Sequence, residues 1–513
     1  MINYLIKISY FFYILIFLNS FSRTNLLKSD TLLNNQNYEV FNNKENLLPI
    51  NSTQEIINFD NLNLIINENN KEIIQFKSRV KQANYLLKSK IAKWYPTFKL
   101  SSSGVPKYTN GFTDKKIGDN TKTDQVQNNL NAIIEWDLYN PSRNSNINSA
   151  RLSLEISKID LDQKQKDLYF ESAKKFFLLQ RSLQDIKIAK QSITIAEVAL
   201  KEAEGRFNSG IGNKLEVLET SIQLKRDELS LSQKVGNLNS IKTELAEILG
   251  IEKGIEVNLG TKPAIIGYWS ASEEESIKYA LENRKDLREI GLQIEKNEQE
   301  RISAIAGYKP TLTLYNNFSY SKEYGESQAI NPNNQNYNRS ENNTVGLKFN
   351  WLIYDGGETF QNYNVYKERE IDLNSLYSLN KIKIINEIKR NFIQLDVSIK
   401  NINTAIEQIK SSRESLKISL MRLKAGLSTQ REIVNNIGDL SESEGNYVQA
   451  ITDYNLNLLS LEKNTNLELI QNCDHADLQK DKLSLNSEIQ ICKNVSLLED
   501  FSEDFSEEIM IDS

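Results

Sequence analysis

The apolar positions of the chain follow two periods, and the shorter one marks four segments. Residues 97–105 follow Pro96 and read as extended chain, while apolar and polar side chains alternate in 129–138, 311–320 and 344–353. A period of two with one apolar face is typical of a half-buried strand. The pattern therefore predicts four strands of about 9–11 residues, the length at which a tilted strand crosses a bilayer.

The longer period predicts helices before and after each pair of strands. Apolar residues three and four apart, between proline and glycine punctuation, give helices over 62–93, 142–207, 215–249 and 273–306. Asn140 and Pro141 are suited to the N-cap and first turn of the 142–207 helix. Asp355-Gly356-Gly357 opens a second long helix.

That second long helix carries an unbroken seven-residue repeat. Its apolar positions are Ile385, Ile388, Phe392, Leu395, Ile399, Ile402, Ile406 and Ile409. Arg413 interrupts the series before Leu416, Leu420 and Leu423. A sustained heptad repeat predicts left-handed coiled-coil packing.

The two halves of the chain repeat one another. Tyr95-Pro96 is echoed by Lys309-Pro310, Trp136 by Trp351, and Gly210 by Gly426, at an offset of 214 to 216 residues. We therefore expect two structural repeats, 51–262 and 263–470, each with the order helix, strand, strand, long helix, helix.

Four strands cannot span a membrane alone, because the edges of an open sheet would leave unpaired backbone groups in hydrocarbon. Eight strands close into a barrel filled by its own side chains, so a conducting lumen needs at least three copies. Trp136, Tyr139, Trp351 and Tyr354 fall at strand ends next to helices, as expected of an interfacial aromatic girdle. The alternative is a small water-soluble sheet packed on helices.

Composition excludes several other classes of protein. The net charge of −6 and the acidic balance argue against nucleic-acid binding. His475 is the only histidine, and Cys473 and Cys492 are the only cysteines, so neither a tetrahedral zinc site nor a histidine-dependent triad is expected. The two cysteines form a disulfide or remain free thiols. No catalytic set, metal or cofactor is predicted.

The ends of the chain lie outside the two repeats. Lys7 and the apolar run from Ile8 to Leu18 predict a signal peptide over 1–22, too short to span a bilayer, with an uncleaved anchor as the alternative. Residues 23–50 form a linker. Residues 471–513 form an acidic tail that we expect to be disordered.

The ordered set of motifs resembles the TolC-type outer-membrane efflux protein family over residues 51–470. The matching motifs are Trp94-Tyr95-Pro96-Thr97-Phe98, Trp136-Asp137-Leu138-Tyr139, Leu249-Gly250, Trp351-Leu352-Ile353-Tyr354-Asp355-Gly356-Gly357 and the turns at Gly210 and Gly426. The resemblance implies an α+β membrane protein: a trimeric transmembrane β-barrel, with four strands per chain, continuing into a long coiled-coil helical tunnel. Residues 250–272 would contribute to an equatorial belt.

The resemblance also implies working residues. Glu216 and Glu432 correspond to acidic residues that ring a periplasmic aperture, and Asn435 stands where a second acid is expected, so a cation-binding ring would be weakened. Each is otherwise an ordinary solvated helix residue. The tips Gly210-Ile211-Gly212 and Gly426-Leu427-Ser428 correspond to adaptor-docking turns, in which glycine also serves as a helix C-cap.

The function implied is a passive exit duct in the outer membrane, with its helical tunnel in the periplasm. It would be a homotrimer that serves a tripartite efflux pump or a type I secretion system. Its partners would be a periplasmic adaptor (membrane fusion) protein, an inner-membrane exporter and outer-membrane lipid. The competing interpretation is a secreted coiled-coil scaffold or adhesin without a pore.

Overall fold

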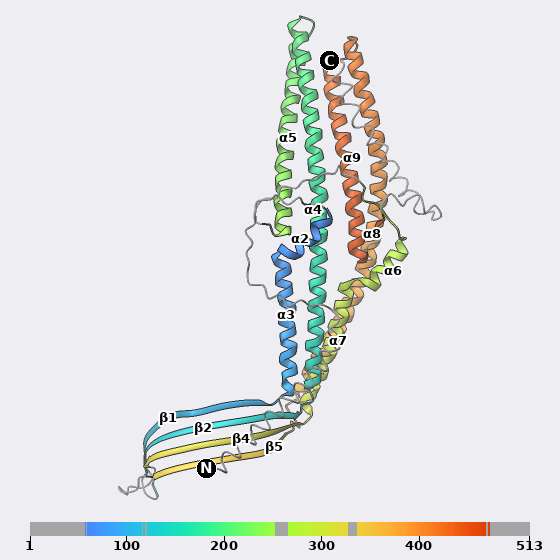
Figure 1. Cartoon of the computed structure of the whole chain (residues 1–513). Helices are drawn as coiled ribbons and strands as arrows, with labels where there is room; N and C mark the ends of the chain where they lie inside the picture. Colours follow the sequence, from blue (N-terminus) through green and yellow to red (C-terminus); the bar gives the residue numbers. More distant parts are fainter. Residues whose placement is uncertain are drawn as a thin grey trace. The chain divides into compact units, whose positions relative to one another are not determined.

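The computed structural model of the chain describes residues 57, 59–114, 116–117, 121–251, 265–326, 336–467 and 470–471. The predicted signal peptide and linker, Cys473, Cys492, His475 and the acidic tail beyond residue 471 lie outside the described residues. The described part is mostly helical, with one four-stranded sheet (Figure 1).

The sheet is antiparallel, with the order β1-β2-β4-β5. Its strands are β1 (Thr97–Thr113), β2 (Thr121–Tyr139), β4 (Thr311–Glu326) and β5 (Asn336–Asn350). They have 17, 19, 16 and 15 residues and are longer than predicted, because they continue into polar sequence where the apolar alternation fades. β5 ends at Asn350, so the predicted strand end at residue 353 is wrong.

Two predicted helices are each divided in two. The 62–93 helix consists of α2 (Leu62–Asn69), α3 (Lys71–Ile91) and a 3-10 turn, η2 (Ala92–Trp94). The break is at Asn70, whose buried side chain accepts hydrogen bonds from Glu72 N and Ile73 N and donates one to Ile248 O at 2.7 Å. An asparagine that caps a helix inside a continuous apolar pattern is difficult to see from sequence.

The second half divides its first helix in the same way. α6 (Glu273–Asn283) is separated from α7 (Lys285–Ile305) by Arg284, which has extended backbone, and η3 (Ala306–Tyr308) follows α7. Arg284 forms ion pairs with Asp286 at 2.7 Å and with Glu387 at 2.6 Å. These contacts hold the break against the long helix that contains Glu387.

Four helices lie side by side (Figure 1): α4 (Arg143–Asn208), α5 (Lys214–Leu249), α8 (Glu358–Lys424) and α9 (Gln430–Thr465). α4 has 66 residues and therefore extends about 100 Å. Ser142 precedes its first residue, so the prediction of Asn140 as N-cap is wrong. Asn140 Oδ1 instead accepts a hydrogen bond from Ser142 N at 3.2 Å.

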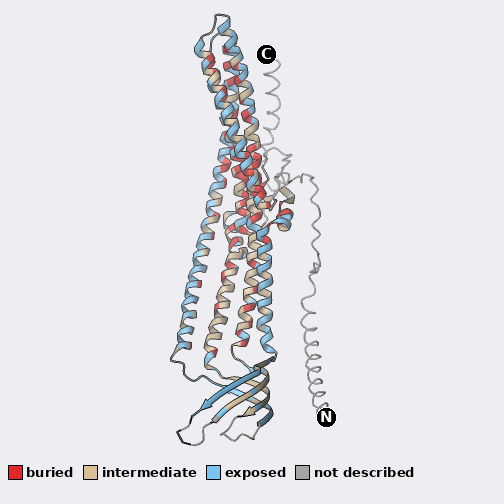
Figure 2. Ribbon diagram, turned by 90° about the vertical axis from the view of Figure 1, so that its left-hand side faces the viewer, coloured by how far each residue is buried: buried red, intermediate tan, exposed pale blue. Residues whose placement is uncertain are grey.

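The core lies among these helices. Buried residues concentrate in the middle of the helical region and are absent from the described part of the four-stranded sheet (Figure 2). Six of the eight predicted heptad positions are buried. Ile385 is half-buried because Ile384 takes the inward position in its place, and Phe392 is half-buried against the core cluster that contains Ile388 and Leu395. Among the described residues, no helix has the length and apolarity needed to cross a membrane.

A two-stranded sheet, β3 (Tyr268–Trp269) with β6 (Ile470–Gln471), packs against this core. Tyr268 and Trp269 are fully buried, and Trp269 Nε1 donates a hydrogen bond to Ser276 Oγ at 2.9 Å. β3 lies within residues 250–272, the region predicted as part of an equatorial belt, whereas β6 lies outside it; residues 252–264 of that region are outside the described part.

Candidate functional site

The strand register separates the sheet into an apolar face and a polar face. Ile134 lies opposite both Phe98 and Asn316, and Leu314 lies opposite both Trp136 and Leu347, so these residues share one side of the sheet. We call this side the apolar face; its further members are Leu100, Ala132, Leu312, Phe318, Val345 and Phe349. Val345, Leu347 and Phe349 are each more than 60% exposed in the single chain.

The opposite side carries mainly polar residues. Asn131 lies opposite Ser101 and Ser319, and Thr313 lies opposite Asp137 and Lys348. Thr313 Oγ1 donates a hydrogen bond to Asp137 Oδ1 at 2.8 Å. A sheet with one uncovered apolar face and one polar face is suited to separating lipid from water.

The aromatic residues predicted as a girdle gather where strands meet helices. Trp136 Nε1 donates a hydrogen bond to Trp94 O at 2.9 Å, and Trp351 Nε1 donates one to Tyr308 O at the same distance. The first hydrogen bond therefore ties the end of β2 to η2, the turn before β1. The second ties the residue that follows β5 to η3, the turn before β4. Tyr139 and Tyr354 are exposed beside them.

The carboxylate of Asp355 stabilises the turn that begins α8. Asp355 Oδ1 accepts hydrogen bonds from Gly357 N at 3.0 Å and Tyr308 OH at 3.2 Å, and Oδ2 accepts one from Thr359 N at 2.9 Å. Hydrogen bonds from the hydroxyl and backbone N–H of Thr359 lower the pKa of Asp355 to about 2. Gly356 and Gly357 both adopt positive φ angles, 71° and 92°, which explains the glycine pair at this turn.

The first helix tip joins α4 to α5. Gly210 has a φ of 76°, Gly210 N donates to Phe207 O, and Ile211 N donates to Arg206 O, which together form a Schellman cap. A Cβ on Gly212 would lie 2.9 Å from Phe207 N, so glycine is required there. Ile211 is 76% exposed at the end of this turn.

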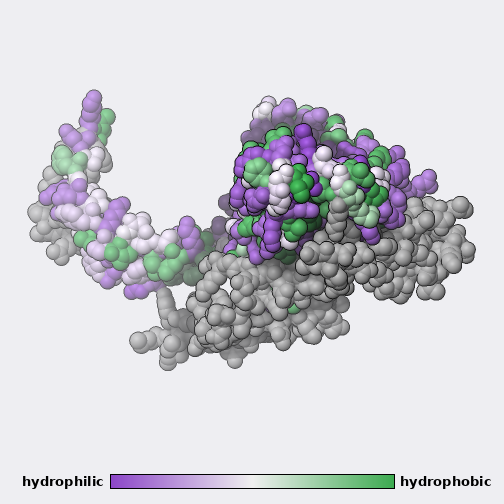
Figure 3. Space-filling view, turned by 90° about the horizontal axis from the view of Figure 1, so that it is seen from above, coloured by the Kyte–Doolittle hydropathy of each residue, from purple (hydrophilic) through white to green (hydrophobic). Residues whose placement is uncertain are grey.

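The second tip joins α8 to α9 with the same geometry. Gly426 has a φ of 69°, Gly426 N donates to Leu423 O, and Leu427 N donates to Arg422 O. Leu427 is 72% exposed, and Ser428 Oγ donates a hydrogen bond to Glu432. In the view from above, hydrophobic and hydrophilic residues are interspersed on the described helices (Figure 3).

The three residues predicted to form an aperture lie at the start of the returning helices. Glu216 is in the first turn of α5, Glu432 is in the first turn of α9, and Asn435 follows on the exposed surface of α9. Glu432 Oε1 forms an ion pair with Arg422 at 2.9 Å. Part of the negative charge predicted for the aperture is therefore offset within one chain.

Arg422 was missed by sequence reasoning. It lies four residues before Gly426, as Arg206 lies four residues before Gly210, and this repeated arginine was the available signal. Besides pairing with Glu432, Arg422 donates a hydrogen bond to Leu427 O at 3.2 Å. It therefore ties the end of α8 to both the turn and the start of α9.

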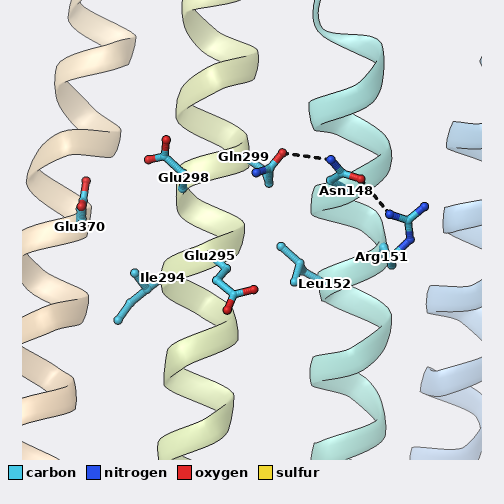
Figure 4. Close-up of a pocket in the computed structure, with 8 residues that line it drawn as sticks. All are labelled: Asn148, Arg151, Leu152, Ile294, Glu295, Glu298, Gln299 and Glu370. Atoms are coloured by element: carbon cyan, nitrogen blue, oxygen red, sulfur yellow. Dashed lines mark hydrogen bonds between the residues drawn. The ribbon is translucent and has the colours of Figure 1, made fainter.

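A groove of about 650 Å³ lies between α4, α7 and α8 (Figure 4). It is lined by Asn148, Arg151, Leu152, Ile294, Glu295, Glu298, Gln299 and Glu370. Asn148 Nδ2 donates to Gln299 Oε1, while Arg301 forms ion pairs with Glu298 and Glu370. Within the described ranges no group of three or more His, Cys, Asp or Glu side chains could hold a metal ion. These partnered charges are typical of a hydrated helix surface.

Solved structures of bacterial outer-membrane channels are similar to this chain. The Vibrio cholerae outer membrane protein VceC is 14% identical, with a TM-score of 0.65 over 79% of this chain and 95% of that one. The Campylobacter jejuni CmeC outer membrane channel is also 14% identical, with a TM-score of 0.65 over 84% and 92%. The open Neisseria gonorrhoeae MtrE outer membrane channel is 15% identical, with a TM-score of 0.61 over 81% and 90%.

Sequence comparison identifies the family. No curated protein matches the chain. The model of the outer membrane efflux protein family, however, matches residues 65–251 and 276–466, well over half of the chain. The two matched segments contain both long helical hairpins and all four strands of the main sheet. The chain therefore belongs to the outer membrane efflux protein family and forms an efflux channel of the outer membrane.

Proposed function

We propose that three copies of this chain close into a twelve-stranded barrel that continues into a helical tunnel in the periplasm. The observation that carries this proposal is the pair of open sheet edges beside an uncovered apolar face. Among the described residues β1 pairs only with β2 and β5 pairs only with β4, so strands of 17 and 15 residues have a free side there. In hydrocarbon each unpaired backbone group costs several kcal/mol, and pairing β5 with β1 of the next copy removes that cost.

Exposed apolar residues on the helices support the same assembly. Ile74, Tyr85 and Leu86 are exposed on α3, and Ile371 and Ile382 are exposed on α8. These helices lead into the edge strand β1 and follow the edge strand β5, respectively. Pairing the edge strands of neighbouring copies would bring α3 of one copy beside α8 of the next and cover these side chains.

The two halves, 51–262 and 263–470, are proposed to be structural repeats. Equivalent helices have matching lengths: 21 residues in α3 and α7, 66 and 67 in α4 and α8, and 36 in both α5 and α9. The paired indole hydrogen bonds and the two Schellman tips support this relation. Three chains with two repeats each would give the tunnel near-sixfold character.

The tips are proposed to receive a periplasmic adaptor that connects the duct to an inner-membrane exporter. Gly210, Ile211 and Gly212 at one tip, with Gly426, Leu427 and Ser428 at the other, offer an exposed apolar residue on a fixed turn. Such turns present Ile211 and Leu427 in a defined orientation at low entropic cost. Energy for export would come from that exporter, in a tripartite pump or a type I secretion system.

Glu216, Glu432 and Asn435 are proposed to line the periplasmic aperture. Threefold symmetry would bring three copies of each toward one axis, where carboxylates attract cations and repel one another. The Arg422–Glu432 ion pair and the amide of Asn435 limit the negative charge of such a ring. We therefore expect weak cation preference and weak block by multivalent cations.

Heat-modifiable trimers in the outer-membrane fraction, together with ion conductance after reconstitution, test this function. A secreted coiled-coil scaffold or adhesin without a pore would also form oligomers, but it would be found outside the membrane fraction and would not conduct. Recovery of the protein outside the membrane fraction, with no conductance after reconstitution, would contradict the proposal.

A further inference from the structure

The apolar face ends in a cluster of basic and aromatic residues. Tyr320, Lys322 and Tyr324 continue the alternation of Leu312, Leu314 and Phe318 along β4. On β5 their direct partners are Glu341, Arg339 and Tyr337, respectively. We call these six residues the basic–tyrosine cluster; by register, all six lie on the apolar face of the sheet.

The tyrosines hold the two cations in place. Lys322 Nζ lies 4.7 Å from the ring centre of Tyr324 and 5.6 Å from that of Tyr337. The guanidinium of Arg339 lies 5.7 Å from the ring centre of Tyr320 and forms an ion pair with Glu341. Lys322 has no carboxylate within ion-pairing distance among the described residues.

The register places two like charges directly opposite one another. Lys322 pairs with Arg339 across β4 and β5, an arrangement that destabilises a sheet unless an anion lies between the charges. Glu341 interacts with Arg339, so one positive charge of the cluster is left in excess. The uncompensated charge predicts an anionic ligand from outside the chain.

The cluster lies at the height of the outer membrane surface. Lys322 is ten residues beyond Leu312, which corresponds to about 33 Å along the strand, or about 25 Å of membrane depth at a tilt near 40°. That is about the height of the apolar band of a membrane barrel. Since the strands enter from the periplasmic helices, the cluster reaches the interface on the opposite, external side.

The charges differ between the two faces at this height. Glu323, which follows Lys322 on β4, lies on the polar face and accepts a hydrogen bond from Gln127 Nε2. Asp124 shares the apolar face but lies farther out, beyond Val126 and its partner Tyr324. On the polar face at this height Glu323 is accompanied by Lys107, which also lies opposite Gln127, whereas the basic–tyrosine cluster, with two cations and Glu341, leaves one positive charge in excess on the apolar face.

We propose that the basic–tyrosine cluster binds the phosphorylated headgroup of a glycolipid in the outer leaflet. Lys322 and Arg339 would share the phosphate, and the exposed rings of Tyr324 and Tyr337 would pack against the sugar. Both rings are accessible, at 41% and 56% exposed in the single chain. The proposal rests on the barrel of the proposed function, because only there does this face meet lipid.

Native mass spectrometry of the full-length trimer tests the site with bisphosphorylated lipid A and with the same glycolipid after removal of its phosphates. The wild type should retain the phosphorylated form, and Lys322→Gln combined with Arg339→Gln should weaken retention about tenfold or more, the loss of one or two charge-assisted contacts. Lys322→Arg should retain it. The matched control is Lys99→Gln combined with Lys348→Gln, which removes two lysines from the polar face and should leave retention unchanged.

Equal retention by the wild type and the Lys322/Arg339 double variant would overturn the site, as would equal retention of the dephosphorylated glycolipid. Binding of inorganic phosphate alone with the affinity of the glycolipid would also contradict a lipid site. Heat-modifiable migration of each variant is measured in parallel. Absence of trimers in the wild type would contradict the barrel itself. Intact trimers in both proteins, with the same lipid retention in the Lys322/Arg339 double variant as in the wild type, would contradict only the lipid site.

Discussion

Ile134→Arg provides a quantitative test of the lipid-facing assignment. Ile134 lies opposite Asn316, four residues beyond Leu312, which places it about 10 Å into an apolar band of about 25 Å. An arginine near the midplane of a barrel's lipid face costs about 2–4 kcal/mol per chain. In three copies the cost is about 6–12 kcal/mol, comparable to the whole stability of many folded proteins.

Asn131→Arg is the matched control, because Asn131 lies three residues earlier on the same strand and faces Ser101 and Ser319 on the polar side. There the added charge would meet water in the lumen. Heat-modifiable trimers are quantified in outer-membrane fractions, and unfolding in urea is followed in phospholipid vesicles. We expect Ile134→Arg to lose most of its trimer and Asn131→Arg to retain it. Equal tolerance of the two substitutions would refute the assignment of the two faces.

The remaining predictions concern the tips and the entry to α8. Gly426→Trp should abolish export while trimers persist. A Cβ at this position meets open space, so the only cost is the strain of the φ of 69°, about 1–2 kcal/mol. Unchanged export in a reconstituted pump would place adaptor docking elsewhere. Glu432→Gln should reduce cation preference in planar bilayers and Arg422→Gln should increase it, so identical selectivity in both would remove Glu432 from the aperture. Because the pKa of Asp355 is lowered to about 2, its stabilising effect is present above the unfolded value near 3.9 and is lost as the pH falls through about 2. Asp355→Asn should therefore flatten the pH dependence of thermal stability in this range, and an unaltered dependence would contradict the role given to this carboxylate.

The sequence predicted the order of the elements well where periodicity was strong. Six of the eight predicted heptad positions of α8 are buried. The two glycine tips and the apolar face of β2, which also depend on local spacing, have the expected conformation and register. The predicted strands were too short. β1, for example, continues through Lys107 and Asn110, where apolar and polar residues no longer alternate. Backbone pairing, which the side-chain pattern does not record, extends these strands.

Contacts between distant residues could not be predicted in the same way. The break at Asn70 depends on Ile248 O, and the ion pair of Glu432 depends on how closely α8 and α9 approach at the tip. Arg413 breaks the apolar series of α8 because it meets Glu444 on α9 at 3.1 Å, a pairing that a one-dimensional pattern does not contain. Such residues become visible only when the helices are placed side by side.

Single-channel recording of the purified protein in a planar lipid bilayer tests whether three copies of the four-stranded sheet enclose a conducting lumen. A trimeric duct should give discrete, long-lived conductance steps, and these should disappear when the heat-modifiable trimers are dissociated by heating. Trimers that insert into the bilayer but give no conductance, or steps that persist from dissociated chains, would contradict a lumen formed by three copies of the four-stranded sheet.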